Sequence, residues 1–274
     1  MPTPFSLCAT CGVEHQHPLP AFCAICADER QYLPEDGRQH WITLNELQTD
    51  HSMDVWEIEP GLHGFTTNPS VGIGHRPLLV QTPSGNLLWD PPAYIDDSAV
   101  ETVRKLGGLR WIAASHPHMN GTQLEWSAAF GDAPVYVNSR DAEWVARSGD
   151  AIKFWDGEVE LAPGLNLIRT GGHFAGSCVV HWRGQDGRGV LLSSDTIYPV
   201  AAKGWVTFLR SYPNRIPLSA GTVQRIADQV LELDFDRLYG NFHNQPITTE
   251  AKQAVKRSAE RHIAWVSGEH DDLT

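Results

Sequence analysis

The sequence has no apolar run of about 18 residues, the length a helix needs to cross a bilayer. It also has no basic segment followed by a long apolar run near Met1, so we expect no secretory signal peptide and a cytoplasmic protein with reduced cysteines. Positive charge is scarce: 21 Lys and Arg residues stand against 33 Asp and Glu residues, a net charge of −12. Nucleic acids and anionic membrane surfaces are bound mainly through Lys and Arg, so this balance disfavours both as partners.

Cysteine is rare but paired. The chain has 274 residues, of which five are cysteines, and four of these form Cys8-x2-Cys11 and Cys23-x2-Cys26. Two such pairs supply four thiolates to one tetrahedral metal. We therefore expect a zinc-ribbon-like module with a four-cysteine site within residues 1–40, with zinc as its structural metal. Iron is the alternative, because the pairs also resemble the rubredoxin-like knuckles of rubrerythrins.

A module this short can bury very little apolar surface, so a bound metal would supply most of its folding free energy. This favours a structural role for the four-cysteine site. The second role of the module would be docking, either to a protein partner or to the other subunit of a homodimer. We expect His15 and His17, between the two cysteine pairs, to be solvent-exposed, and Cys178 to be a small buried apolar residue.

A loop with two histidines is the most informative part of the remaining chain. His116 and His118 follow the apolar run 109–114. In an extended segment, side chains two positions apart point to the same side, so both rings can reach one cation. Neutral imidazole is a common ligand of zinc and iron. The next two places, where a second metal would need a carboxylate and an imidazole, hold Asn120 and Gly121.

Four further residues of ligand type each follow a strand-like run: Asp90, His173, Asp195 and His243. With the H-x-H loop, this series resembles the metallo-β-lactamase superfamily, whose members carry H-x-H-x-D-H, then G-H-T-x-G-S, then a strand ending in S-G-D, then a late histidine. The resemblance covers roughly residues 50–265. It implies an α/β fold, an αββα four-layer sandwich over residues 50–270, preceded by the small four-cysteine module.

The resemblance also implies roles for individual residues. The first metal site would be His116, His118 and His173, with Asp195 as the residue that usually bridges two metals and His243 as the late histidine. Asn120 and Gly121 depart from the pattern, so we expect a single zinc or iron ion. Asp195 and Asn120 would then serve catalysis, and Asp90 would orient the site through hydrogen bonds. The region of Trp205 and Phe208 borders the site in this family, so these residues are candidate walls of the substrate pocket.

The pattern of apolar residues also predicts secondary structure. Residues 28–50 have helix-type sequence, with Thr43 as an N-cap and Glu46 three positions later. Residues 55–90 suggest an antiparallel meander. The remaining expected elements are helices at 97–106, 140–146, 221–233 and 248–264, and strands at 109–115, 135–137, 165–169, 179–182, 190–193 and 237–239.

Three functions fit these observations. The first is a metal-dependent hydrolase of a small ester, thioester or lactone, a substrate class that the resemblance alone implies. The second is a binding or scaffold protein that has lost catalysis and uses the four-cysteine module to dock a partner. The third is a mononuclear iron dioxygenase of the persulfide type, which would use His116, His173 and Asp195 and leave His118 surplus.

Overall fold

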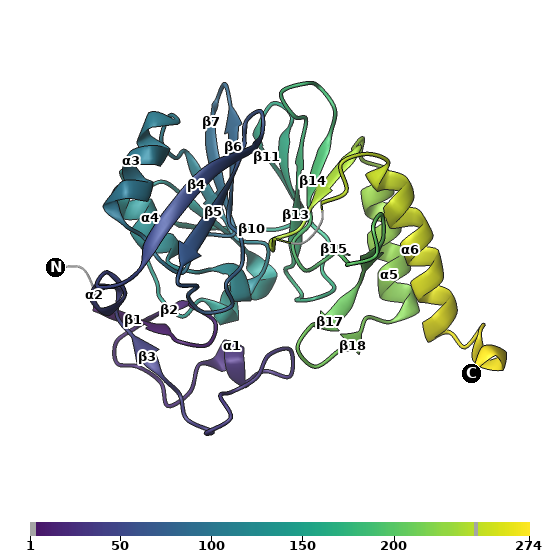
Figure 1. Cartoon of the computed structure of the whole chain (residues 1–274), viewed down its shortest axis with the longest axis horizontal. Coiled ribbons are helices and arrows are strands. Elements are labelled where there is room, and N and C mark those ends of the chain that lie inside the picture. The colour runs from purple at the N-terminus through teal and green to yellow at the C-terminus, as the bar shows by residue number, and fades with distance from the viewer. Residues whose placement is uncertain (1–3, 244–245) are drawn as a thin grey trace. The chain divides into compact units, whose positions relative to one another are not determined.

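Short apolar runs between residues 52 and 89 alternate with turns and form four antiparallel strands, which confirms the predicted meander. The computed structural model describes residues 4–243 and 246–274. Three further strands extend the meander in parallel pairings, so the sheet is mixed (Figure 1). Its seven strands are β4 (Ser52–Glu59), β5 (Leu62–Asn68), β6 (Leu78–Thr82), β7 (Gly85–Trp89), β8 (Trp111–Ala113), β9 (Val135–Asn138) and β10 (Ile152–Trp155).

The chain divides into two compact units, Met1–Trp155 and Asp156–Thr274. This division does not coincide with the predicted boundary between a module at 1–40 and a domain at 50–270, which stays a prediction. The N-terminal segment and the seven-stranded sheet belong to the same unit. The four-cysteine module therefore lies in the same unit as the loop that carries His116 and His118.

Helices of the first unit follow the strands of the sheet and pack against it. The expected helix 97–106 is confirmed as α3 (Asp97–Lys105), although its N-cap is Asp96, whose carboxylate accepts the Ala99 N–H. A helix that we did not predict, α4 (Gln123–Ala129), follows the histidine loop. The expected helix 140–146 is instead the 3-10 segment η2 (Ser139–Trp144), because Val145 adopts an extended backbone and ends it.

The N-terminal segment forms its own three-stranded sheet, in the order β2-β1-β3. Its strands and short helices are β1 (Phe5–Cys8), β2 (Glu14–Gln16), α1 (Ala24–Ala27), β3 (Trp41–Ile42) and α2 (Leu44–Leu47). The predicted capping box of Thr43 and Glu46 is confirmed. The prediction of helix-type structure over 28–50 is wrong outside α2, because Trp41 and Ile42 pair with β1 and turns occupy the residues before them.

The second unit contains a five-stranded sheet in the order β11-β12-β13-β14-β19, antiparallel except for the last pair. Two of its strands, at 165–169 and 237–239, have the predicted bounds. The sheet consists of β11 (Glu158–Ala162), β12 (Leu165–Arg169), β13 (Cys178–Trp182), β14 (Val190–Leu192) and β19 (Arg237–Tyr239). The predicted strands at 179–182 and 190–193 are confirmed as β13 and β14, which pair as an antiparallel hairpin.

Two helices lie side by side in the second unit (Figure 1). They are α5 (Ala220–Leu231), which buries Val223, Ile226 and Val230, and α6 (Ala251–Val266). The remaining short elements are η1 (Pro117–Met119) in the first unit and β15 (Tyr198–Pro199), β16 (Val206–Thr207), β17 (Leu209–Ser211), β18 (Ile216–Pro217) and η3 (Asp271–Leu273) in the second. Within the described residues, no helix is both long and apolar enough to span a membrane.

Candidate metal centres

The four N-terminal cysteines meet in one cluster. Their sulfur atoms all lie within 4.8 Å of one another, with Sγ–Sγ distances of 3.6 Å for Cys8–Cys26 and 3.8 Å for Cys11–Cys23. Zinc–sulfur bonds of about 2.3 Å at tetrahedral angles place two sulfurs about 3.8 Å apart. A disulfide would require a separation of about 2.05 Å, and the structure describes all five cysteines without a disulfide. The geometry therefore fits four ligands around one metal.

Interactions among the four thiols lower the pKa of Cys8 and Cys23, which favours their thiolate forms, and raise the pKa of Cys11 and Cys26. Interactions with Cys11 lower the pKa of the Cys23 thiol, and the Gln39 side chain donates to Cys8 Sγ at 3.2 Å. The predicted exposure of His15 is wrong: it is buried with its ring 4.7 Å from that of Trp41, while His17 is exposed as expected. His15 is covered because its ring packs edge-on against Trp41 of β3 in the same sheet.

The histidine loop brings His116 and His118 together, but not through an extended strand. His116 has an extended backbone, and the 3-10 turn η1 that begins at Pro117 follows it directly. Both side chains are about 3% exposed, their ring centroids are 5.2 Å apart, and each offers a nitrogen within 4.8 Å of the other's. The Ser115 hydroxyl lies 2.8 Å from His116 Nδ1, so metal binding by that ring would use Nε2.

Asp90 supports the same loop from the end of β7. It is fully buried, has a φ of 54°, and its Oδ1 accepts the Ser115 N–H at 2.7 Å. A positive φ is unusual for a residue with a side chain, and contacts around it must hold it in place. His75 Nε2 supplies two of these, at 3.0 Å from the Asp90 carbonyl oxygen and 3.1 Å from that of Pro91. Burial lowers the pKa of His75, so the ring is a neutral donor.

Gly121 occupies a position that has no room for a side chain. Its φ is +49°, and an added Cβ would lie 2.2 Å from the Pro91 carbonyl oxygen and 2.5 Å from that of Pro92. An imidazole cannot be built here without moving backbone. The departure from the family pattern is therefore a change in how the loop packs, and not only the loss of one ligand.

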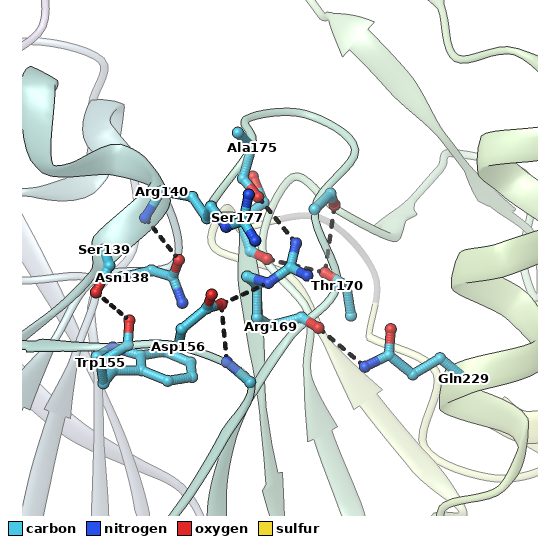
Figure 2. A network of polar contacts seen from close by, with 12 residues as sticks. Asn138, Ser139, Arg140, Trp155, Asp156, Arg169, Thr170, Ala175, Ser177 and Gln229 are labelled. Atoms are coloured by element: carbon cyan, nitrogen blue, oxygen red, sulfur yellow. Dashed lines mark hydrogen bonds and ion pairs between the residues drawn. The ribbon is translucent and has the colours of Figure 1, made fainter.

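In the second unit, His173 lies in a loop between β12 and β13 that hydrogen bonds hold closed. The Thr170 and Gly171 N–H groups donate to the Ser177 carbonyl, and the Ser177 hydroxyl accepts the Phe174 N–H at 2.7 Å. Figure 2 shows the base of this loop, where Arg169 pairs with Asp156 and donates to the Ala175 carbonyl. These hydrogen bonds and this ion pair fix the conformation of the loop.

The ring of His173 has a defined orientation. Its Nδ1–H donates to the Leu209 carbonyl at 3.1 Å, which leaves Nε2 as the basic nitrogen. This Nε2 lies 3.9 Å from Asp195 Oδ2, and both side chains are buried. Asp195 follows β14 and Ser194, and the φ of Ser194 is 47°. The backbone carbonyl of Asp195 accepts a hydrogen bond from the Tyr212 hydroxyl at 2.9 Å. The second unit therefore presents one imidazole and one carboxylate as a preformed pair.

Other predicted site residues lie elsewhere. His243 is exposed and is not part of the group that contains His173 and Asp195, and its role as a metal ligand stays a prediction. Phe208 is fully buried in the core of the second unit, and the Trp205 ring stacks with Arg257 and Arg261 of α6. Phe208 is fully buried and is therefore no pocket wall, whereas Trp205 is half-buried and its role as a pocket wall stays a prediction.

Three further residues lie in or near the histidine loop: Asn120, which was predicted, and His75 and Glu14, which were not. Asn120 is buried directly after η1. Sequence reasoning missed Glu14, whose N–H donates to the Gly121 carbonyl in the histidine loop, and His75, which binds the backbone carbonyl of Asp90 and so supports the loop indirectly. His75 gives no signal in the sequence beyond being one of 13 histidines. Glu14 could have been noticed as an acidic residue close to a cysteine knuckle.

No protein-family model matches the chain. The uncharacterized protein YmaE of Bacillus subtilis (strain 168) is 42% identical over 272 residues, which cover 97% of this chain and 98% of that protein. Among solved structures, the DIM-1 metallo-β-lactamase aligns with a TM-score of 0.57 at 14% identity, over 77% of this chain and 98% of its own. The metallo-β-lactamase FIM-1 from Pseudomonas aeruginosa, in its mono-zinc form, aligns with a TM-score of 0.53 at 15% identity, over 76% and 95%.

The two metallo-β-lactamase structures confirm the predicted fold class. At 14% and 15% identity they show the fold and nothing about the activity. The chain thus belongs to the same family as Bacillus subtilis YmaE, and it has the fold of the metallo-β-lactamases with an N-terminal cluster of four cysteines.

Proposed function

We propose that His116, His118, His173 and Asp195 bind one divalent cation, and that the chain is a single-metal hydrolase. The observation that carries this proposal is the burial and the orientation of two pairs of ligand-type side chains, His116 with His118 and His173 with Asp195. Each pair is buried, and hydrogen bonds orient two of the three rings so that Nε2 is the nitrogen that a metal would use. Three imidazoles and a carboxylate form a donor set typical of zinc, with iron as the alternative.

One cation is favoured over two by the residues at positions 120 and 121. A second metal would need a carboxylate and an imidazole there, and the chain offers a neutral amide and a glycine that has no room for a ring. The mono-zinc form of FIM-1 is a precedent for this fold with one metal. For the four-cysteine cluster, we propose zinc in a structural role, because all four of its places are taken by sulfur.

A bound divalent cation would supply Lewis acidity and would lower the pKa of a bound water molecule to about 7. Around the cation, the chain's own residues would hold the ligands in place and orient the substrate or water molecule. Asp90 and Ser115 fix the loop that carries His116, and Leu209 fixes the ring of His173. The Asn120 amide can orient a substrate or a water molecule but cannot take a proton, so we assign proton transfer to Asp195. The substrate class that we propose is a small ester, thioester or lactone.

The iron dioxygenase is a weaker candidate. That function would leave His118 without a role, whereas His118 is buried beside His116. The four-cysteine cluster requires reduced thiols, which supports the proposal of a cytoplasmic protein. Docking of a partner or of a second copy through the N-terminal module remains a prediction.

The experiment that tests the metal site is elemental mass spectrometry on the wild type and on the double variant His116→Ala/His118→Ala. We expect two metal ions per chain to fall to one, with the ion in the four-cysteine cluster retained. His40→Ala is a matched control, because His40 is an exposed histidine paired with Asp36. It should leave the count at two.

One metal ion in both the wild type and the double variant would contradict the proposal and favour a binding protein. Iron in place of zinc, together with O₂ consumption on a thiol persulfide, would favour the dioxygenase. If two zinc ions are found, hydrolysis of esters, thioesters and lactones is the next measurement.

A further inference from the structure

The helix behind the histidine loop is not capped by its own sequence. The N-cap residue of α4, Thr122, makes no side-chain hydrogen bond to the helix. The Leu124 N–H, the group that an N-cap side chain usually accepts, instead donates to Glu14 Oε1 at 2.8 Å. A carboxylate at this place also interacts favourably with the helix dipole. The cap therefore comes from a residue 110 positions earlier in the chain.

Glu14 holds the loop at a second point and is itself held. Its backbone N–H donates to the Gly121 carbonyl at 3.1 Å, and its Oε2 accepts from Arg147 Nη1 at 2.5 Å. Arg147 also binds Glu125 of α4 at 2.8 Å. Glu14 is 2% exposed, and its burial raises the pKa to about 7 against the opposing effect of Arg147. Burying a carboxylate is costly, and this one accepts two hydrogen bonds, from the Leu124 N–H and from Arg147, which argues for a specific role.

Glu14 belongs to the four-cysteine module, three residues after Cys11. The knuckle that contains Cys11 fits closely against the rest of the first unit. A Cβ at Gly12 would lie 2.4 Å from Ala93 Cβ, and a Cβ at Gly72 would lie 2.6 Å from the Cys11 carbonyl carbon. Trp144 and Ile73 also pack against the cysteine cluster. The knuckle has no freedom to shift without moving the segments that it contacts.

We infer that Glu14 is a positioning residue that couples the four-cysteine centre to the metal-binding loop of His116 and His118. The four cysteines fix β2, β2 presents Glu14, and Glu14 fixes Gly121 and the start of α4. The segment 115–124 is then held from both ends, by Asp90 Oδ1 at its start and by Glu14 at its end. This inference rests on the proposed function for its effect on metal binding, but not for its effect on the loop.

The test compares Glu14→Ala and Glu14→Gln with the matched control Asp96→Asn. Asp96 caps α3 in the same unit and accepts two backbone N–H groups, from Ala99 and Met53, without touching the loop. Hydrogen exchange of the segment 115–124 is measured in each variant, together with Co²⁺ affinity at the histidine site by absorption. Co²⁺ bound by thiolates in the four-cysteine cluster is distinguished by its sulfur charge-transfer bands.

For Glu14→Ala we expect hydrogen exchange in 115–124 to become at least about tenfold faster. We also expect the Co²⁺ affinity of the histidine site to fall about tenfold, which is the lower end of the range of about 10–100-fold for loss of a residue that supports a metal ligand. Glu14→Gln keeps an oxygen for the Leu124 N–H and should recover most of both losses. Asp96→Asn should change neither. If Glu14→Ala does not fold, Glu14→Asp takes its place, because the side chain that is one methylene shorter moves the carboxylate away from the Leu124 N–H; it is compared with Glu14→Gln and Asp96→Asn by the same two readouts.

Unchanged exchange in 115–124 in both Glu14 variants would overturn the inference. An equal change in Asp96→Asn would do the same, because the effect would then be general destabilisation. A wild type that binds no Co²⁺ outside the four-cysteine cluster would instead overturn the proposed function. The exchange result would still decide whether Glu14 positions the loop.

Discussion

The cysteine centre and the histidine centre of this chain are built in opposite ways. All four sulfurs come from residues 8–26, and two knuckles bring them within 4.8 Å of one another. The proposed ligands of the histidine centre come from loops between residues 116 and 195, and these loops have supports far away in the sequence, Asp90 for the loop of His116 and Leu209 for the ring of His173. The first centre is closed by four identical donors, as in structural sites, whereas the second has mixed donors, as in sites that bind substrate. The spacing of the cysteines alone therefore predicts the four-cysteine centre, whereas the spacing of the histidines alone does not predict the supports of the histidine centre.

The largest expected effect comes from breaking the closed centre. Cys23→Ser removes one thiolate from a module with almost no core of its own, and Glu14 of that module caps α4. We expect loss of one metal ion and destabilisation of more than about 4 kcal/mol, seen by urea unfolding with metal analysis. The double variant His116→Ala/His118→Ala should lose its metal with a much smaller change in stability. Equal losses of stability would erase the distinction between the two centres.

Gly121→Ala tests whether the second metal place was lost through packing. The new Cβ would meet two backbone carbonyl oxygens, so we expect a loss of about 3–5 kcal/mol in urea unfolding. Gly131→Ala is the matched control: it also has a positive φ, of 71°, but nothing lies within 4 Å of its added Cβ. We expect that change to cost about 1–2 kcal/mol, from the backbone alone.

Similar losses for both glycine variants would mean that the loop at Gly121 can move. In that case Asn120→Asp combined with Gly121→His could restore a second metal ion. With the packing as described, that double variant should gain no metal and should lose stability.

The smallest effect is expected at His243. Its side chain is exposed and lies outside the ligand group of its unit. His243→Ala should therefore leave the metal count unchanged and alter stability by no more than about 0.5 kcal/mol. A loss of one metal ion per chain in this variant would show that the histidine centre extends further than the four proposed ligands.

Much of the fold could be predicted because its signals are local. The strands at 165–169 and 237–239 and the capping box of Thr43 follow from residues next to one another in sequence. The helix expected over 28–50 failed because β1 offers hydrogen bonds to Trp41 and Ile42 that outweigh their local preference. The prediction of Phe208 as a pocket wall is wrong for a related reason. Its side chain packs with residues of α5 and α6 in the core, and the local sequence does not show these contacts.

The sequence by itself determined the four-cysteine cluster, the order of the ligand-type residues and the loss of ligands at 120 and 121. Spacing and residue type are sufficient there, because a metal demands particular donor atoms. Tertiary structure alone decided that Gly121 has no room for a side chain, that His75 supports the strained Asp90, and that Glu14 caps α4. These contacts join positions up to 110 residues apart, and only packing of the folded chain brings such groups within hydrogen-bonding distance.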